Sequence, residues 1–223
     1  MRNDDGRYLR ENWYENLEII SKEARISNKP FWAFALTVSH GNYPIPTLSE
    51  LRLQIYSNLA YGAQGIQYFT YWTPLKKTEW NYQHGPISDV SKQRTEVYDR
   101  IKIVNREIQS LAGVFLGAKI TSVAHTGSVI PNGTKRLGQL PSKIKKIETT
   151  GVGAIVSFLE KGEENFVVIV NRDFHNSMKL VLEGDATLKK ILKDGTIVPA
   201  NTYLNTLEID PGDIAIYSWN ETF

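Results

Sequence analysis

The sequence predicts two fold classes in succession, the last strand–helix units of a (β/α)8 (TIM) barrel over residues 1–116 and a C-terminal antiparallel β-sandwich over residues 117–223. In the first part, amphipathic helical segments alternate with short strands that are apolar on both faces, as in a parallel sheet covered by helices. From about Gly117 the pattern changes to short alternating strands separated by turn residues, which is typical of a sandwich. We therefore expect two domains with a boundary near residues 113–118.

The first part is expected to alternate helices and strands. Apolar residues at spacings of three and four predict the helices, and Thr47 with Glu50 forms a capping box where the second helix begins. The intervening stretches FWAFALTV and GIQYFTYW are apolar at nearly every position, which predicts strands buried on both faces. In order, the predicted elements are helix 8–27, strand 31–38, helix 47–61, strand 65–72 and helix 89–112.

The second part is expected to consist of short strands. Each stretch alternates apolar and polar residues and ends at a glycine, asparagine or proline turn. The basic cluster KIKK at 143–146 is interpreted as a solvated turn. The predicted strands are 119–126, 153–160, 165–172, 178–184, 188–195, 205–213 and 214–219.

The first part also raises the question of what covers its strands. Two parallel strands leave open edges that need a neighbour. That neighbour would come from elsewhere in a parent gene, of which this chain would be a fragment, or from another copy of this chain. We expect a homo-oligomer that covers the open barrel edges and buries the inner faces of Phe31, Phe34, Leu36, Tyr68 and Phe69.

Residues 46–72, PTLSELRLQIYSNLAYGAQGIQYFTYW, resemble the end of the catalytic barrel in glycoside hydrolases of the clan that includes the family 42 β-galactosidases. Those enzymes carry a helix of the pattern E-x-R-x-x-x-Y-x-x-L-A-x-G-A, followed by G-I/V-x-Y-F on the eighth strand. The resemblance implies that the ligand is a carbohydrate and that a β-sandwich follows the barrel. The matching residues are Glu50, Arg52, Tyr56, Leu59, Ala60, Gly62, Ala63, Gly65, Ile66, Tyr68 and Phe69.

Candidate sugar-binding residues follow the two predicted strands. Active sites of such barrels lie at the C-terminal ends of the strands. Sugar rings offer flat C–H faces to aromatic side chains and hydroxyl groups to polar ones, and both kinds of side chain occur at these strand ends. The predicted substrate-binding residues are His40, Asn42, Tyr71, Trp72 and Trp80.

The carboxylates needed for hydrolysis are not found. Glycoside hydrolysis uses a pair of carboxyl groups, and the resemblance places the nucleophile at the end of the strand that matches 31–38. No Asp or Glu occurs between Arg25 and Glu50, and Glu50 is assigned to the capping box. The catalytic residues are therefore unknown, with Glu79 in the loop after the second strand as a weak candidate.

We expect a fragment or divergent member of a glycoside hydrolase family that acts on carbohydrate but is not catalytically competent as this chain alone. The alternative is a non-catalytic carbohydrate-binding or assembly protein. Whether the chain is an enzyme is therefore left open.

Composition limits the other function classes. The chain has 41% apolar and 22% charged residues and a formal charge of +2, which gives no reason to expect nucleic acid as a partner. It has no cysteine, so disulfides and thiolate metal sites are excluded, and neither a metal nor a cofactor is expected. No apolar run approaches a membrane span, and the polar N-terminus is unlike a signal peptide. The compartment is left open, and a periplasmic or secreted parent protein is compatible with it.

Overall fold

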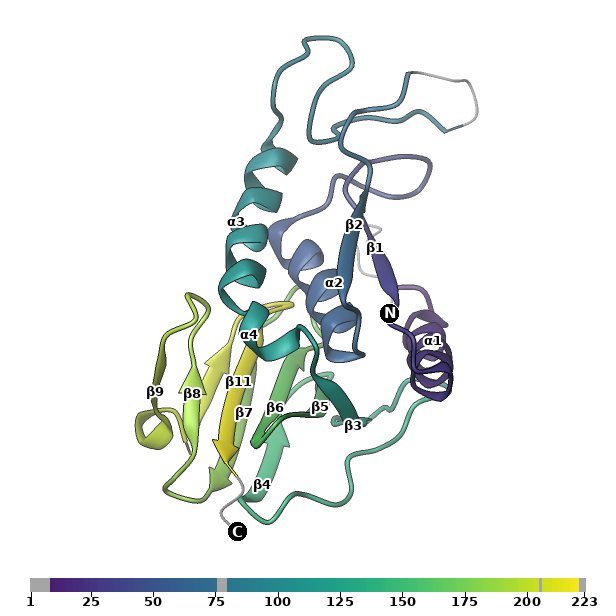
Figure 1. Ribbon diagram of the computed structural model, residues 1–223. Coiled ribbons are helices and arrows are strands. Elements are labelled where there is room, and N and C mark those ends of the chain that lie inside the picture. Colours follow the sequence, from purple (N-terminus) through teal and green to yellow (C-terminus); the bar gives the residue numbers. More distant parts are fainter. Residues whose placement is uncertain (1–8, 76–79, 205, 221–223) are drawn as a thin grey trace.

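The structure, a computed structural model, describes residues 9–75, 80–204 and 206–220 (Figure 1). The elements are α1 (Trp13–Ser27), β1 (Trp32–Leu36), α2 (Leu48–Ala60), β2 (Gly65–Phe69), α3 (Glu96–Ser110), α4 (Ala112–Phe115), β3 (Lys119–His125), β4 (Ile144–Thr149), β5 (Ala154–Lys161), β6 (Glu164–Asn171), β7 (Met178–Gly184), β8 (Lys189–Ile191), β9 (Ile197–Pro199), the 3-10 helix η1 (Ala200–Thr202), β10 (Leu207–Ile209) and β11 (Ile214–Asn220).

The strands of the described residues form three sheets. The large sheet has the order β3-β5-β6-β11-β8-β9, and the small sheet has the order β10-β7-β4. Both are antiparallel throughout. The parallel pair consists of β1 and β2, with Trp32 opposite Gly65 and Leu36 opposite Phe69.

The predicted fold class is wrong. Among the strands of the described residues, parallel pairing is confined to β1 and β2, and no series of alternating strand–helix units follows them. The prediction failed because a strand that is apolar on both faces can have one of those faces left uncovered by its own chain. In the parallel pair, Ala35 is buried on one face, whereas on the other face the side chains of Trp32, Phe34 and Phe69 are 64%, 62% and 41% exposed.

Several element boundaries also differ from expectation. The third helix begins at Glu96 rather than near residue 89, because Thr95 provides the cap by accepting a hydrogen bond from the Val97 amide. Of the KIKK cluster, Lys143 lies in a turn as expected, whereas residues 144–146 belong to β4, with Ile144 buried. The capping box of α2 is confirmed, with Thr47 and Glu50 hydrogen-bonded to each other's backbone amides.

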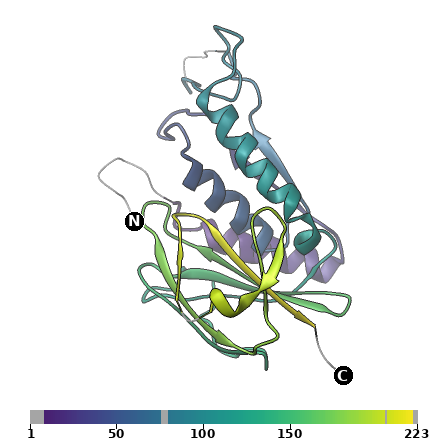
Figure 2. The same cartoon turned by 90° about the vertical axis from the view of Figure 1, so that its left-hand side faces the viewer.

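The large sheet has an apolar cluster on each face. One cluster lies between this sheet and the helices, and the other lies between it and the small sheet, so the helices and the small sheet cover opposite faces. Figure 2 shows the helices (purple to teal) on one side of the sheets (green to yellow). The helix-side cluster joins residues from both sides of the predicted boundary, for example Leu51 and Tyr56 with Ile155 and Val168. The boundary itself stays a prediction.

Helix α2 is the element most completely enclosed by its neighbours. Its side chains Leu51, Leu53, Ile55 and Tyr56 are all buried, so apolar contacts surround it rather than lying along one stripe. At its first turn, the β10–β11 turn approaches so closely that a Cβ on Gly212 would lie 2.2 Å from the Ser49 carbonyl oxygen. Gly212 also has a φ of +67°, so only glycine fits there without strain.

An ion cluster ties α2 and α3 to two turns of the large sheet. The Arg52 guanidinium donates to the Glu107 carboxylate and lies 3.5 Å from an Asp213 oxygen, and Lys193 also pairs with Asp213. Tyr56 donates a hydrogen bond of 2.7 Å to Glu107. Burial by itself would raise the pKa of Glu107, but the hydrogen bonds from Arg52 and Tyr56 and the charges of Arg52 and Lys193 outweigh it and lower that pKa.

We predict that Glu107→Gln lowers the free energy of unfolding by about 2 kcal/mol, because it removes the charged acceptor of the Arg52 hydrogen bonds at a mostly buried position and leaves Arg52 with the Asp213 carboxylate at 3.5 Å. Since the folded state lowers the pKa of Glu107, its stabilising contribution is present above the ordinary carboxyl pKa and is lost as the pH falls. Urea unfolding at pH 7 and pH 3 measures this. The exposed Glu160→Gln is the control, and an equally small effect of both substitutions would contradict the role of the cluster.

Self-association also stays a prediction, and the exposed outer face of the parallel pair is the surface that it would use. We predict that the purified chain sediments as an oligomer at micromolar concentration, and that Trp32→Lys shifts it towards the monomer by placing a charge on this apolar face. Analytical ultracentrifugation measures both. A wild-type chain that sediments as a monomer over the same concentrations would contradict the prediction.

Candidate functional site

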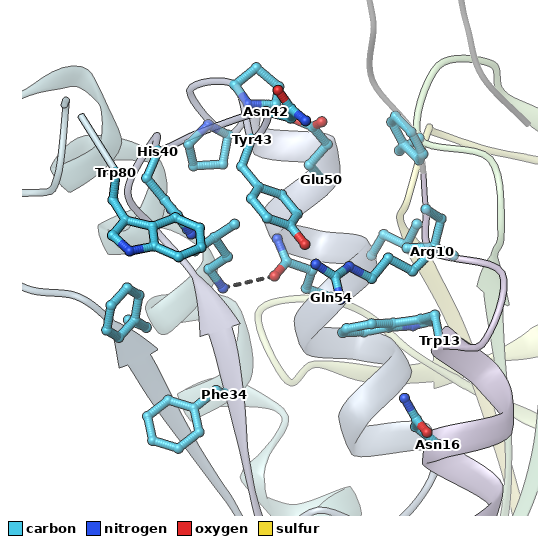
Figure 3. Close-up of a pocket in the computed structure, with 17 residues that line it drawn as sticks. Arg10, Trp13, Asn16, Phe34, His40, Asn42, Tyr43, Glu50, Gln54 and Trp80 are labelled. Atoms are coloured by element: carbon cyan, nitrogen blue, oxygen red, sulfur yellow. Dashed lines mark hydrogen bonds between the residues drawn. The ribbon is translucent and has the colours of Figure 1, made fainter. Parts of the chain in front are cut away.

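A cavity of about 570 Å³ lies between β1, α2 and the segment that leads into α1 (Figure 3). Figure 3 shows His40 and Trp80 on one side of it and Arg10 and Trp13 on the other. Its lining residues combine aromatic rings with amides and a few charges. They are Leu9, Arg10, Trp13, Asn16, Phe34, Leu36, His40, Asn42, Tyr43, Pro44, Pro46, Glu50, Leu53, Gln54, Phe69, Trp80 and Phe174.

His40 lies at the centre of an aromatic cluster at one end of this cavity. Its ring centroid is 5.0 Å from that of Tyr43, 5.2 Å from Tyr82, 6.0 Å from Trp80 and 6.1 Å from Phe69. These separations are typical of edge-to-face and offset ring contacts. The cluster fixes the orientation of His40 and Trp80 before any ligand arrives.

Two loops that follow β1 and β2 hold this cluster in place. Ser39 and Gln83 exchange two backbone hydrogen bonds of 2.9 Å, so the loops are joined like a short antiparallel ladder. The Gly41 amide donates to the Trp80 carbonyl at 3.0 Å. Gly41 adopts a φ of +52°, a conformation that glycine accepts readily and that brings its backbone against the Trp80 ring.

Polar groups line the cavity together with the rings. Gln54 of α2 accepts a hydrogen bond of 2.8 Å from the Leu36 amide, which orients its side-chain NH2 group as a remaining donor. Asn16 and Asn42 are exposed lining residues, and each brings a donor and an acceptor. The Arg10 guanidinium lies 5.4 Å from the Tyr43 ring centroid, a distance at which a cation and a ring attract.

The cavity has few acidic groups. Of the described residues that line it, Glu50 alone carries a carboxylate. One of its oxygens accepts hydrogen bonds from the Thr47 amide at 2.7 Å and the Thr47 hydroxyl at 2.9 Å, so this carboxylate serves the capping box. Glu79, the weak catalytic candidate, lies outside the described residues. The described lining therefore lacks the carboxyl pair that glycoside hydrolysis uses.

The predicted binding residues divide between different places. His40, Asn42 and Trp80 meet in the cavity. Tyr71 instead lines a groove beside α3, and Trp72 faces the Lys92 ammonium group at 5.1 Å.

The sequence reading missed several lining residues. Arg10 and Asn16 carry no local signal, because only the docking of α1 brings them to the cavity. Gln54 could have been noticed as a polar residue within a helix whose other side chains are mostly apolar.

A buried polar cluster docks α1, which forms one wall of the cavity. The ring of Tyr14 in α1 packs edge-on against His125 of β3, with 5.0 Å between centroids. His125 Nε2 lies 2.8 Å from the Tyr61 hydroxyl, which donates in turn to Glu18 of α1 at 3.2 Å. A neutral His125 that carries its proton on Nε2 fits these contacts, because it donates to the Tyr61 hydroxyl while that hydroxyl donates to Glu18. Burial, with a smaller contribution from the Arg172 charge, lowers the pKa of His125 to about 3.

No protein-family model and no curated protein matches this chain. Among solved structures it is similar to the GH42 β-galactosidase Gan42B, at 12% sequence identity and a TM-score of 0.27. The match covers 67% of this chain and 15% of that one, so this chain spans less than a sixth of the length of the enzyme. At this TM-score the likeness supports no conclusion about the fold or the function of this chain.

Among residues 9–75, 80–204 and 206–220, no cluster of three or more His, Asp or Glu side chains could hold a metal ion. No helix in the same ranges combines the length and the apolar character needed to cross a membrane.

We predict that His125 makes stability fall as the pH falls from about 6.5 to about 3. The unfolded chain binds a proton at this residue near pH 6.5, whereas the folded state does so only near pH 3, so stability falls as the pH falls. The advantage of wild type over His125→Gln should shrink by about 2 kcal/mol from pH 7 to pH 5. Urea unfolding at both pH values measures this difference, and an equal pH dependence of the two proteins would contradict a buried neutral histidine.

Proposed function

We propose that this chain binds a neutral mono- or disaccharide in the cavity and does not hydrolyse it. The observation that carries the proposal is that preset aromatic rings and side-chain amide groups line one cavity of about 570 Å³. Sites for small ligands in proteins have about this size, and combine an apolar lining with a few polar groups that fix orientation.

The side chains match the two kinds of surface on a sugar. Trp80 and Tyr43 provide flat faces for the C–H groups of a pyranose ring, and Trp80 is held by the loop contacts of Gly41 and His40. In the same lining, Gln54 and Asn42 provide donors and acceptors for hydroxyl groups. Arg10 and Glu50 bring charges of opposite sign, which supports a neutral ligand over a strongly charged one.

Binding is supported over hydrolysis by the state of Glu50. A retaining glycosidase needs two carboxyl groups about 5 Å apart, and an inverting one about 6.5–9.5 Å apart. Glu50 is the single carboxylate of the described lining and is engaged by Thr47. The resemblance of residues 46–72 to family 42 enzymes agrees with the same class of ligand, and a divergent member could keep sugar contacts after losing its catalytic pair.

We predict that lactose or cellobiose binds with a dissociation constant of about 1 mM, as expected for one small, partly open site. Trp80→Ala should weaken binding at least about tenfold, which corresponds to 1.4 kcal/mol of lost ring contact. Trp72→Ala is the matched control, because Trp72 and Trp80 are 43% and 51% exposed but only Trp80 lines the cavity. Titration of amide resonances by NMR measures all three proteins.

Two outcomes would overturn the proposal. Binding that is lost in Trp72→Ala but kept in Trp80→Ala would move the site away from the cavity. Release of nitrophenol from any nitrophenyl glycoside, if abolished by Glu50→Gln or Glu79→Gln, would show that the chain is a hydrolase and not only a binding protein.

A further inference from the structure

A groove of about 410 Å³ lies beside the parallel pair, on the side of β2 and α3 rather than that of β1 and α1. It is separate from the sugar cavity, with which it shares no lining residue. Three tyrosine rings and two cations dominate its surface. The lining residues that matter here are Tyr68, Tyr71, Tyr98, Lys102, Asn105 and Arg106.

The two outer edges of the parallel pair differ in whether side chains hydrogen-bond to their backbone groups. Along β1, side chains of α2 cover the edge, since Gln54 accepts from the Leu36 amide at 2.8 Å and the Asn58 side-chain amide lies 3.5 Å from the Phe34 carbonyl oxygen. Glutamine and asparagine side chains thus take the place of a further strand. The edge of β1 is therefore capped at Phe34 and Leu36.

The edge of β2 has no such cover. The Thr37 amide donates to the Phe69 carbonyl, so Phe69 turns its backbone groups towards β1. Successive residues of a strand turn these groups to alternate sides, which leaves Ile66 and Tyr68 facing away from β1. Within the described residues no hydrogen bond reaches the outward backbone groups of Ile66 and Tyr68. The sequence GIQYF also lacks the lysines and prolines that usually protect a strand edge.

The groove beside this edge is positively charged. Lys102 and Arg106 lie one turn apart on α3, both are exposed, and neither forms an ion pair within the described part of the chain. The guanidinium group of Arg94 lies 4.3 Å from the Tyr98 ring centroid at the end of the groove and adds a third cation. No lining residue of the groove in the described structure is acidic. The occupant that complements this surface carries negative charge.

We propose that the edge of β2 accepts an extended acidic segment of another protein as an added strand. The backbone of that segment pairs with Ile66 and Tyr68, which supplies affinity independent of its sequence. Side chains two residues apart on a strand are about 6.8 Å apart, and residues four apart on a helix are about 6 Å apart along its axis. Carboxylates at alternate positions of the segment therefore reach Lys102 and Arg106 together.

A second copy of this chain is a poorer occupant. An antiparallel pairing of β2 with its own copy would relate the two subunits by a twofold axis beside this groove. The same axis would bring Lys102 and Arg106 of both copies to one side of the joined sheet, and like charges facing each other oppose association. A segment with carboxylates at alternate positions attracts Lys102 and Arg106 instead of repelling them. Such a segment belongs to a different protein.

The test uses three capped nine-residue peptides with a fluorescent label. One alternates valine with glutamate, the second alternates valine with lysine, and the third repeats the first with a central proline that cannot donate to the ladder. We expect the valine–glutamate peptide to bind wild type at least about tenfold more tightly than either of the others in fluorescence anisotropy at low salt. In hydrogen exchange, it should slow the amides of Ile66 and Tyr68.

Charge-reversal variants complete the test. The double substitution K102E/R106E should weaken the valine–glutamate peptide at least about tenfold, whereas K179E/K189E, at two exposed lysines of the sheets, should leave its binding within about twofold. Far-UV circular dichroism checks that both variants fold.

Four results would overturn the proposal. The first is no binding of the acidic peptide, and the second is equal binding to both charge-reversal variants. The third is binding without protection of Ile66 and Tyr68, which would mark a simple charged surface. The fourth is concentration-dependent protection of these amides in the absence of peptide, which would mean that a second copy occupies the edge.

Discussion

The enclosure of α2 between the large sheet and the parallel pair is the constraint on which the rest of the structure depends. Leu51, Leu53, Ile55 and Tyr56 point in different directions from the helix axis and all are buried. Each buried aliphatic side chain of this size contributes roughly 1.5–3 kcal/mol, and that contribution is lost if either neighbour of the helix moves away. The helix therefore fixes the relative position of the sheet behind it and the strands in front of it.

The cavity is a consequence of that enclosure. Its floor includes Leu53 and Gln54 of α2, and Gln54 also binds the Leu36 amide of β1, so helix and strand are set against each other by the same side chain. The wall that carries Arg10 depends on α1, which Tyr14 docks against His125 of the large sheet. Ring and amide groups from three separate segments thus meet only when all of these packing contacts are made.

Local chemistry was predictable from the sequence, whereas long-range packing was not. The capping box at Thr47 needs residues three apart and could be recognised directly. In helix α1, Ile20 lies at the apolar spacing of three from Leu17 and four from Ala24, but its side chain is 42% exposed and Tyr14 is buried instead, because contact with His125 decides which face docks. A local pattern shows that a helix has an apolar face but does not reveal the polar partner that competes for it.

The residues of the candidate site also divide into those that local sequence predicted and those that depend on long-range packing. His40, Asn42 and Trp80 were identified because they follow strands, where loops commonly carry function. Arg10 was missed because it reaches the cavity only through the docking of α1, far from the loops in sequence. The failure of the predicted barrel has a similar origin, since the apolar outer face of Trp32 and Phe34 looks the same in sequence whether it is covered or exposed.

Native-state hydrogen exchange of α2 and β6 tests most directly whether helix and sheet share one core. If they do, the amides of Leu53 and Tyr56 in α2 and of Val168 in β6 will exchange through the same opening, with equal opening free energies and equal denaturant dependence. The account would be contradicted if the α2 amides exchanged through a smaller, separate opening while the Val168 amide stayed protected.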